Sequence, residues 1–386
     1  MTDRLIAEAG RENTIVINTG DNFFQTGEPE LEDKKAEVIF NSLDMIGIDF
    51  VGLGEQEFIF GVPLIGNLTK NSQVHLGCAN VKDIRHVSQY LVPYLRLNKG
   101  MKQVLITAVI DPQVLSSTHE KIVFTDPVTA LKRIKKSISH DIFIVICHAD
   151  AVRAEKWLTQ ISGIDLVILG HQPGVSEKKR EIIGAMVAFN NDQGKFVSHV
   201  DLVQKDGRYA VAGPHNTRLQ VKTIAEDRSV AKLIEEYEGW SREYHYAKSK
   251  NQHMAKASST IENIYVGKNR CMECHEETVV SWAKTAHARA LDSLIRKGKE
   301  YDPQCLQCHV TGMNDKSHGG GFISLNLTPL MVNVQCEQCH GPGGMHAQDP
   351  ENVSARLSRE QTCLGCHTRD TDPGFSYQKR QETGIH

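Results

Sequence analysis

Four copies of the motif Cys-x-x-Cys-His lie between residues 271 and 367, and no other feature of the sequence constrains the fold as strongly. Two thiols on one turn of chain can bond to the two vinyl groups of a haem, and the next histidine then reaches the iron as its proximal ligand. The motifs therefore predict four covalently bound haem c groups, whose macrocycles supply most of the core of this segment. The four motifs are Cys271, Cys274 and His275; Cys305, Cys308 and His309; Cys336, Cys339 and His340; and Cys363, Cys366 and His367.

Zinc ribbons and redox dithiols also use Cys-x-x-Cys, and they are the main alternatives to haem attachment. All four copies here end in histidine, which neither alternative requires. The repetition therefore favours haem.

Four further histidines follow residue 266: His287, His318, His346 and His386. A short segment that encloses four macrocycles places almost any buried histidine near an iron, so we expect His287, His346 and His386 to be distal ligands. His318 lies in the polar stretch SHGGGF and is either a solvated side chain or the sixth ligand of the second haem; we lean slightly toward ligation. On one helix, His275 and His287 would lie roughly 18 Å apart, too far to share one haem.

The runs CHEETVVSWAKTAHARAL, CLQCHVTG with GGGF, VQCEQCHGPGGMH and CLGCH followed by FSYQKRQETGIH resemble the tetrahaem cytochrome c554 family over about residues 266–386. The resemblance implies distal ligands at His287, His346 and His386, with His287 serving a different iron from His275. It also implies stacked haem pairs that form an electron path. That family leaves its second haem five-coordinate, so His318, nine residues after His309, is a departure from the pattern.

Residues 1–222 alternate short apolar runs with amphipathic segments, which is typical of an α/β domain. Amphipathic stretches such as LEDKKAEVIFNSLDMIG and DPVTALKRIKKSI predict helices between the strands. Residues 223–265 predict a linking helix and linker, and residues 266–386 a mainly helical, haem-packed domain. The strand candidates are TIVIN (14–18), FVGLG (50–54), QVLITAVI (103–110), DIFIVICH (141–148), DLVILGH (165–171) and AMVAFN (185–190).

The strings TIVINTGDNFFQTG, GLGEQEFIFG, IVICHAD and DLVILGHQPG resemble, in this order, the motifs of calcineurin-like metallophosphatases, most closely the 5′-nucleotidase branch. The resemblance covers about residues 5–205 and implies a metallophosphatase-like α/β sandwich. Of the family's metal ligands, Asp21, His148 and His171 are retained.

Other ligands of that family are replaced: Glu55 and Gln56 stand for Asn and His, and Pro173 stands for the last His. The strand that carries an Asp-x-His pair in the family would precede Met1, so we expect an N-terminally truncated domain. Because a two-metal phosphatase needs a full set of ligands, we expect no hydrolysis, although the retained ligands could still hold one metal. Cys78 and Cys147 lie beside buried runs and are expected to be core residues.

The formal net charge of −3 and the spread of basic residues give no reason to expect a nucleic-acid partner. No apolar stretch predicts a transmembrane segment, and the start MTDRLIAEAG has no pattern of an export signal. Covalent haem attachment ordinarily takes place outside the cytoplasm. We therefore expect a periplasmic or extracellular protein whose export signal is not part of this chain.

These features favour an electron carrier over an enzyme: a tetrahaem cytochrome with a non-catalytic, phosphatase-like docking domain. Redox proteins are the expected partners, with self-association left open. One alternative is a redox enzyme that acts on a small nitrogen compound, of the hydroxylamine or NO type, at an open second haem. A weaker alternative is a metal-dependent phosphoesterase.

Overall fold

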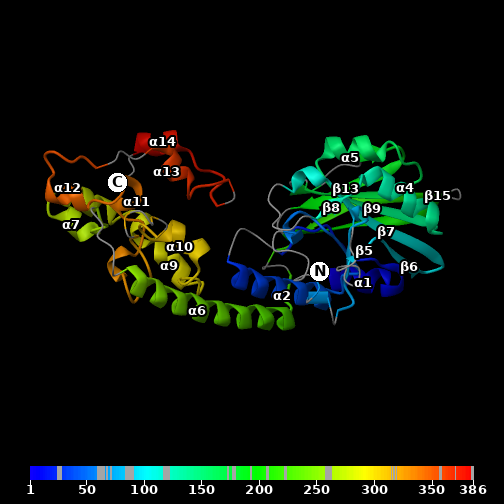
Figure 1. Cartoon of the computed structure of the whole chain (residues 1–386), viewed down its shortest axis with the longest axis horizontal. Coiled ribbons are helices and arrows are strands. Elements are labelled where there is room, and N and C mark those ends of the chain that lie inside the picture. Colours follow the sequence, from blue (N-terminus) through cyan, green and yellow to red (C-terminus); the bar gives the residue numbers. More distant parts are fainter. Residues whose placement is uncertain are drawn as a thin grey trace. The chain divides into compact units, whose positions relative to one another are not determined.

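The computed structural model describes residues 1–23, 28–58, 66, 68–69, 72–82, 91–115, 122–171, 174–175, 180–191, 194–205, 208–220, 224–256, 263–313, 315, 318, 320–355, 359–369 and 371–383. The chain divides into two compact units, Met1–Tyr237 and Glu238–His386. The strands of the described residues belong to the first unit, and short helices make up most of the second (Figure 1). The boundary falls inside helix α6 (Arg228–Lys256), where the sequence predicts a linking helix.

A seven-stranded sheet forms the centre of the first unit. Its order is β11-β13-β10-β9-β7-β6, with β12 paired to β13, and the four strands from β13 to β7 are parallel. Strand β9 is buried at every residue, as expected for a strand that is covered on both faces. The strands are β6 (Leu95–Lys99), β7 (Lys102–Ile110), β9 (Ile142–His148), β10 (Leu166–Gly170), β11 (Gly174–Val175), β12 (Arg180–Ile182) and β13 (Ala185–Asn191).

A second, smaller sheet consists of four short parallel strands in the order β1-β2-β3-β5. Phe50 from this sheet packs in one apolar core with Ile106 and Ile144 from the larger sheet. The two sheets therefore form a sandwich. The four strands are β1 (Ile17–Asn18), β2 (Phe50–Gly52), β3 (His75–Gly77) and β5 (Leu91–Val92).

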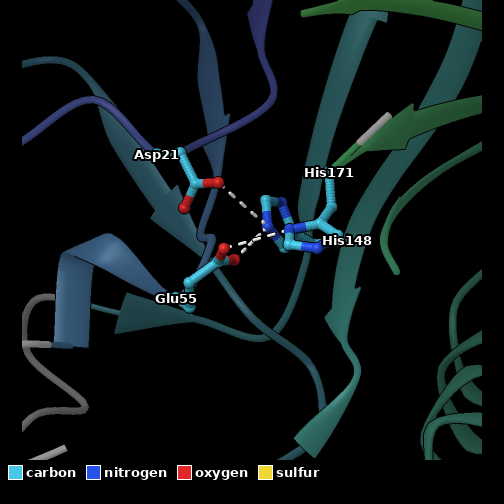
Figure 2. A group of neighbouring side chains, drawn as sticks. All are labelled: Asp21, Glu55, His148 and His171. Atoms are coloured by element: carbon cyan, nitrogen blue, oxygen red, sulfur yellow. Dashed lines mark hydrogen bonds and ion pairs between the residues drawn. The ribbon is translucent and has the colours of Figure 1, made fainter. Parts of the chain in front are cut away.

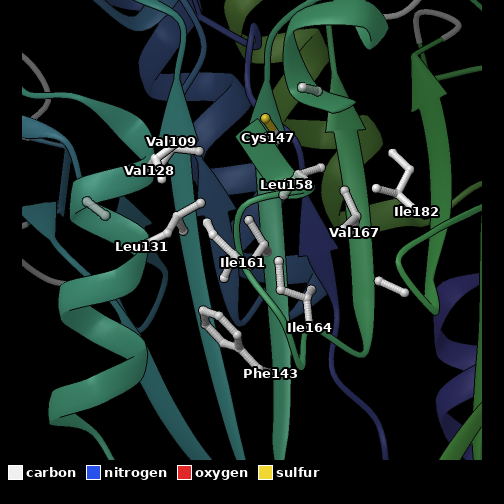
Figure 3. Packing of buried hydrophobic residues seen from close by; sticks show 14 of the residues in the cluster. Val109, Val128, Leu131, Phe143, Cys147, Leu158, Ile161, Ile164, Val167 and Ile182 are labelled. Carbon is white, nitrogen blue, oxygen red and sulfur yellow. The ribbon is translucent and has the colours of Figure 1, made fainter. Parts of the chain in front are cut away.

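Helices cover the outer faces of both sheets. Helix α2 (Pro29–Ile46) packs through Phe40 and Leu43 in the core cluster that contains the smaller sheet. Helices α4 (Pro127–Ser137) and α5 (Ala151–Leu158) pack on the larger sheet, where Leu131 and Leu158 meet Phe143 (Figure 3). This arrangement confirms the predicted metallophosphatase-like α/β sandwich.

Two aspartates fix where the outer helices begin. The Asp126 side chain accepts a hydrogen bond from the backbone N–H of Thr129, and Asp150 caps α5 in the same way. Cys78 and Cys147 lie in apolar core clusters, and burial raises the pKa of both thiols to about 12. They are protonated core side chains at neutral pH.

The remaining described elements of the first unit are a short N-terminal helix, one small strand pair and a long hairpin. The hairpin packs on the sheet sandwich through Val200, Leu202, Tyr209 and Val211. These elements are α1 (Thr2–Ala9), β4 (Val81–Lys82), β8 (Val123–Phe124), β14 (Phe196–Lys205) and β15 (Arg208–Arg218).

The second unit is built from short helices and loops, as the sequence predicts for a haem-packed domain. Its described apolar core is small, consisting of Leu291, Leu294, Leu306, Val310, Phe322 and Met331. In the described part of the chain, no helix is both long enough and apolar enough to cross a membrane. The helices are α7 (Lys268–Met272), α8 (Glu276–Trp282), α9 (Ala290–Ile295), α10 (Pro303–His309), α11 (Cys336–His340), α12 (Gly344–Gln348), α13 (Glu360–Leu364) and α14 (Tyr377–Thr383).

Candidate functional site

The cysteines of the four motifs lie in or next to four short helices: α7, α10, α11 and α13. All eight are at least partly exposed, and none of them is joined in a disulfide. The thiols of Cys271 and Cys336 lie within hydrogen-bonding reach of each other, and so do those of Cys308 and Cys366. The first motif is therefore next to the third, and the second is next to the fourth.

Two pairs of histidine rings face each other across gaps that fit a metal ion. The ring centres of His275 and His346 are 6.1 Å apart with an interplanar angle of 19°. Those of His287 and His367 are also 6.1 Å apart, at 63°. Metal–imidazole bonds are about 2 Å long and the ring nitrogen lies about 1 Å from the ring centre, so two ligands on opposite sides of one ion have centres about 6 Å apart.

The pairing joins residues that are distant in sequence. His346, six residues after the third motif, faces the histidine of the first motif, and His287 faces the histidine of the fourth. His287 and His275 are thus assigned to different irons.

Several of these rings are held by their second nitrogen, as is common for histidines that bind a metal. A hydrogen bond through Nδ1 orients the ring and leaves Nε2 available for an iron. The bonded pairs are His309 Nδ1 with the Ala290 carbonyl oxygen at 2.6 Å, His346 Nδ1 with the Val353 carbonyl oxygen at 2.5 Å, and His367 Nδ1 with Asp372 Oδ2 at 2.9 Å.

His318 has a different setting. Its Nδ1 lies 2.8 Å from Asp315 Oδ2, which also accepts a hydrogen bond from the Tyr265 hydroxyl at 2.9 Å. His318 lines a cavity of about 420 Å³ together with His340 of the third motif, and His309 is not among the described residues that line it. The predicted pairing of His318 with the second haem therefore finds no support in this arrangement. His386 lies outside the described residues.

A buried glutamate that the sequence did not single out connects the first and third motifs. The Glu337 carboxylate accepts hydrogen bonds from the backbone N–H groups of Val266 at 3.0 Å, Gly267 at 2.7 Å and Gly343 at 2.7 Å. Gly267 immediately precedes α7, and Gly343 precedes α12, which carries His346. Glu337 thus positions the segments that bring His275 and His346 together.

A second group of possible ligands lies at the carboxyl ends of parallel strands in the first unit (Figure 2). Asp21 follows β1, Glu55 follows β2, His148 ends β9 and His171 follows β10. One ligand atom from each residue lies within 4.8 Å of those from the other three. Strand ends are where open α/β sheets place their ligand sites.

Within this cluster the two carboxylates contact both imidazoles. His148 Nε2 lies 2.5 Å from Glu55 Oε2 and 3.2 Å from Asp21 Oδ2, and His171 Nδ1 lies 3.0 Å from Glu55 Oε1. Burial lowers the pKa of His148, but the hydrogen bonds and charges of Asp21 and Glu55 outweigh this and raise it to about 10. A protonated His148 occupies the place that a cation would take, and a metal ion would displace this proton.

Glu55 corrects one inference from the sequence. The sequence analysis counted Glu55 as a lost ligand, but its carboxylate lies inside the cluster. The resulting set of two imidazoles and two carboxylates suits one divalent ion such as Zn²⁺, Fe²⁺ or Mn²⁺. Pro173, the other replacement considered, lies outside the described residues.

The backbone of the cluster is held in uncommon conformations. Asp21 and His171 both have φ of 57°, in the left-handed region that non-glycine residues seldom adopt. A Cβ on Gly54 would lie 2.2 Å from Asp21 Oδ1 and 2.6 Å from His148 Cε1, so only glycine fits there. Such strain is typical of functional sites.

Glu57, which is completely buried, ties the two carboxylate loops together. Its side chain accepts hydrogen bonds from the backbone N–H groups of Asp21 at 2.9 Å, Asn22 at 2.7 Å and Gly54 at 2.8 Å. Burial and the Asp21 charge raise the pKa of Glu57, and the three backbone hydrogen bonds oppose the shift. The string GLGEQEFIFG contains Glu57, but nothing in the string shows which backbone groups it binds.

The fold and the motifs define a metallophosphatase-like α/β domain joined to a c-type cytochrome domain. Residues 270–341 match the family model described as cytochrome c554 and c-prime, which spans the first three motifs. Cytochrome c-554 of Nitrosomonas europaea is 36% identical over 94 residues, or 20% of this chain and 39% of that protein. The C-terminal part of the chain therefore contains a cytochrome c554 domain, and the match spans well under half the length of this relative.

Solved structures resemble the remainder of the chain in fold alone. Sulfate thiohydrolase SoxB of Thermus thermophilus aligns with a TM-score of 0.52 and 16% identity over 61% of this chain and 45% of its own. A 5′-nucleotidase precursor, also from Thermus thermophilus, aligns with a TM-score of 0.51 and 18% identity over 69% of this chain and 54% of its own. The α/β unit thus has the fold of the 5′-nucleotidases, as the sequence predicts.

Proposed function

We propose that this chain is an electron-transfer protein that carries four covalently bound haem c groups. The observation that carries the proposal is the pairing of His275 with His346 and of His287 with His367, at ring separations that fit one iron each. An iron with two axial histidines has no open position for a substrate, so its role is to accept and pass on electrons.

The positions of the thiols support an electron path between haems. The first and third motifs meet at Cys271 and Cys336, and the second and fourth meet at Cys308 and Cys366. Haems attached at neighbouring thiols lie close together, which favours transfer within each pair.

Redox proteins in the periplasm or outside the cell are the partners that this proposal requires, because covalent haem attachment ordinarily takes place there. The α/β unit is proposed to dock such a partner rather than to hydrolyse phosphoesters. Its described ligand cluster contains four donors, which is a set for one metal ion, whereas two-metal hydrolysis needs ligands for both ions.

The mass of the intact holoprotein tests the proposal. We expect four haem additions in the denatured protein, and three in a Cys363→Ala/Cys366→Ala variant that lacks the fourth pair of thioether bonds. A Cys147→Ala variant is the matched control and should retain four, since Cys147 belongs to the apolar core of the other unit. Fewer than four additions in the unmodified chain, or zinc in place of iron, would contradict the proposal.

One observation favours a second candidate, a redox enzyme with an open second haem. His318 bonds to Asp315 and shares its cavity with His340, while His309 bonds to the Ala290 carbonyl oxygen. Within the described residues, no second histidine ring faces His309 as His346 faces His275. The iron at His309 would then have an open position for a small ligand such as NO.

A further inference from the structure

The β14–β15 hairpin carries three metal-ligating side chains that belong to neither site described above. His199 and Asp201 lie on β14, and His215 lies on β15. One ligand atom from each lies within 4.8 Å of those from the other two. The group therefore has the reach to hold one ion.

A β-bulge brings His215 into this group. His199 pairs directly with His215, but two residues further along β14, Asp201 pairs with Ala212, three residues away on β15. The extra residue lies at Gly213–Pro214 and reverses the alternation of the strand. Without it His215 would point to the same face as Val211.

The opposite face of the hairpin is fixed to the sheet sandwich. Val200 and Leu202 of β14 and Tyr209 and Val211 of β15 pack against the apolar core between the sheets. Since side chains alternate along a strand, His199 and Asp201 point away from that core. The three ligands are thus presented toward solvent on a strand pair that is anchored from below.

The two imidazoles are close together and one has an unused nitrogen. The ring centres of His199 and His215 are 4.9 Å apart with an interplanar angle of 31°. His199 Nδ1 is buried and has no hydrogen-bond partner among the described residues. Buried polar atoms are nearly always hydrogen-bonded, and an unsatisfied one calls for an explanation such as a missing ion.

We propose that His199, Asp201 and His215 form a site for a divalent transition-metal ion of the Zn²⁺ class. Two imidazole nitrogens and one carboxylate oxygen are ligands that Zn²⁺ accepts, and they leave a fourth position for water or an external ligand. Calcium and magnesium are disfavoured because they prefer all-oxygen sites. The site does not depend on the electron-transfer proposal, because none of its residues belongs to the cytochrome unit.

The test is zinc binding by the metal-stripped holoprotein, measured by equilibrium dialysis and elemental analysis with haem iron as the internal standard. We expect His215→Ala to lose one equivalent of zinc relative to the unmodified protein. The control Thr217→Ala, on the same face of the same strand, should lose none. Equal zinc content in His215→Ala and the unmodified protein would overturn the proposal.

Two further arms exclude loss of folding and the four-residue cluster as explanations. Asp201→Asn keeps the shape of the side chain and should weaken binding at least roughly tenfold by removing the charge. In a Glu55→Ala background, zinc K-edge absorption should still show two imidazole ligands, and adding His199→Gln should remove them. Persistence of the same spectrum after that change would refute the assignment.

Discussion

The rings of His287 and His367 lie 6.1 Å apart, although one follows the first Cys-x-x-Cys-His motif and the other ends the fourth. A distance of this size fits two axial ligands of a single iron. The first and last motifs of the cytochrome unit are therefore joined through one coordination site.

Replacing His287 by alanine should leave one iron five-coordinate and high-spin. The physical reason is that the variant keeps the thioether bonds and His367 but loses the facing imidazole. The EPR spectrum of the oxidised protein should gain one high-spin signal per molecule. His245→Ala, which removes a ring that lies near Tyr301 instead, should leave the spectrum unchanged. An unaltered spectrum in the His287 variant would show that this side chain is not a ligand.

Carbon monoxide distinguishes between the two functions considered for the second motif. If the iron at His309 is open, the reduced protein should bind one CO per four haems, and His318→Ala should leave this stoichiometry unchanged. The reason is that His318 bonds to Asp315 and shares a cavity with His340. Optical titration provides the measurement. Appearance of CO binding only after His318→Ala would instead assign His318 to the second iron.

The cluster of Asp21, Glu55, His148 and His171 should retain one divalent metal ion and show no phosphoester hydrolysis. Glu55→Ala should remove the ion, because Glu55 contacts both imidazoles. Glu55→Asn, which restores the type of residue expected from the resemblance, should retain part of the binding. Elemental analysis and an AMP hydrolysis assay check both statements. Metal-dependent turnover that Asp21→Ala abolishes would revive the phosphoesterase alternative.

Glu57→Ala should destabilise the α/β unit by about 3 kcal/mol or more. The change leaves three backbone N–H groups without their acceptor in a buried position. Denaturant unfolding followed by far-UV circular dichroism measures the loss. Glu37→Ala removes an exposed carboxylate that pairs with Lys34, and it should cost less than about 0.5 kcal/mol. Similar midpoints for the two variants would contradict the role given to Glu57.

The parts of the fold that the sequence predicts well are those that depend on local pattern. The buried runs 103–110 and 141–148 coincide with β7 and β9, because a strand covered on both faces consists almost entirely of apolar residues. The haem-attachment motifs are equally local. Their chemistry is contained in five consecutive residues.

The remainder depends on contacts between distant segments, which spacing does not reveal. Glu337 and Glu57 appear in the sequence as ordinary charged residues, and their importance comes from the backbone groups that surround them. Glu55 was misread because a substitution was taken as a loss, although its carboxylate still reaches the cluster. The orientation of His215 could not be predicted, because one extra residue in a strand reverses every face assignment beyond it.

The two histidine pairs interleave along the chain: His275 is followed by His287, then by His346 and His367, so that each pair spans one member of the other. Once an iron joins each pair, the chain is closed into two overlapping loops. Such closures limit the conformations open to the unfolded chain, as disulfides do, and the entropy removed increases with loop length. The same ligands that set the electronic properties of the irons thus also serve as cross-links, and removing one ligand shortens the lifetime of the folded unit as well as altering its redox chemistry.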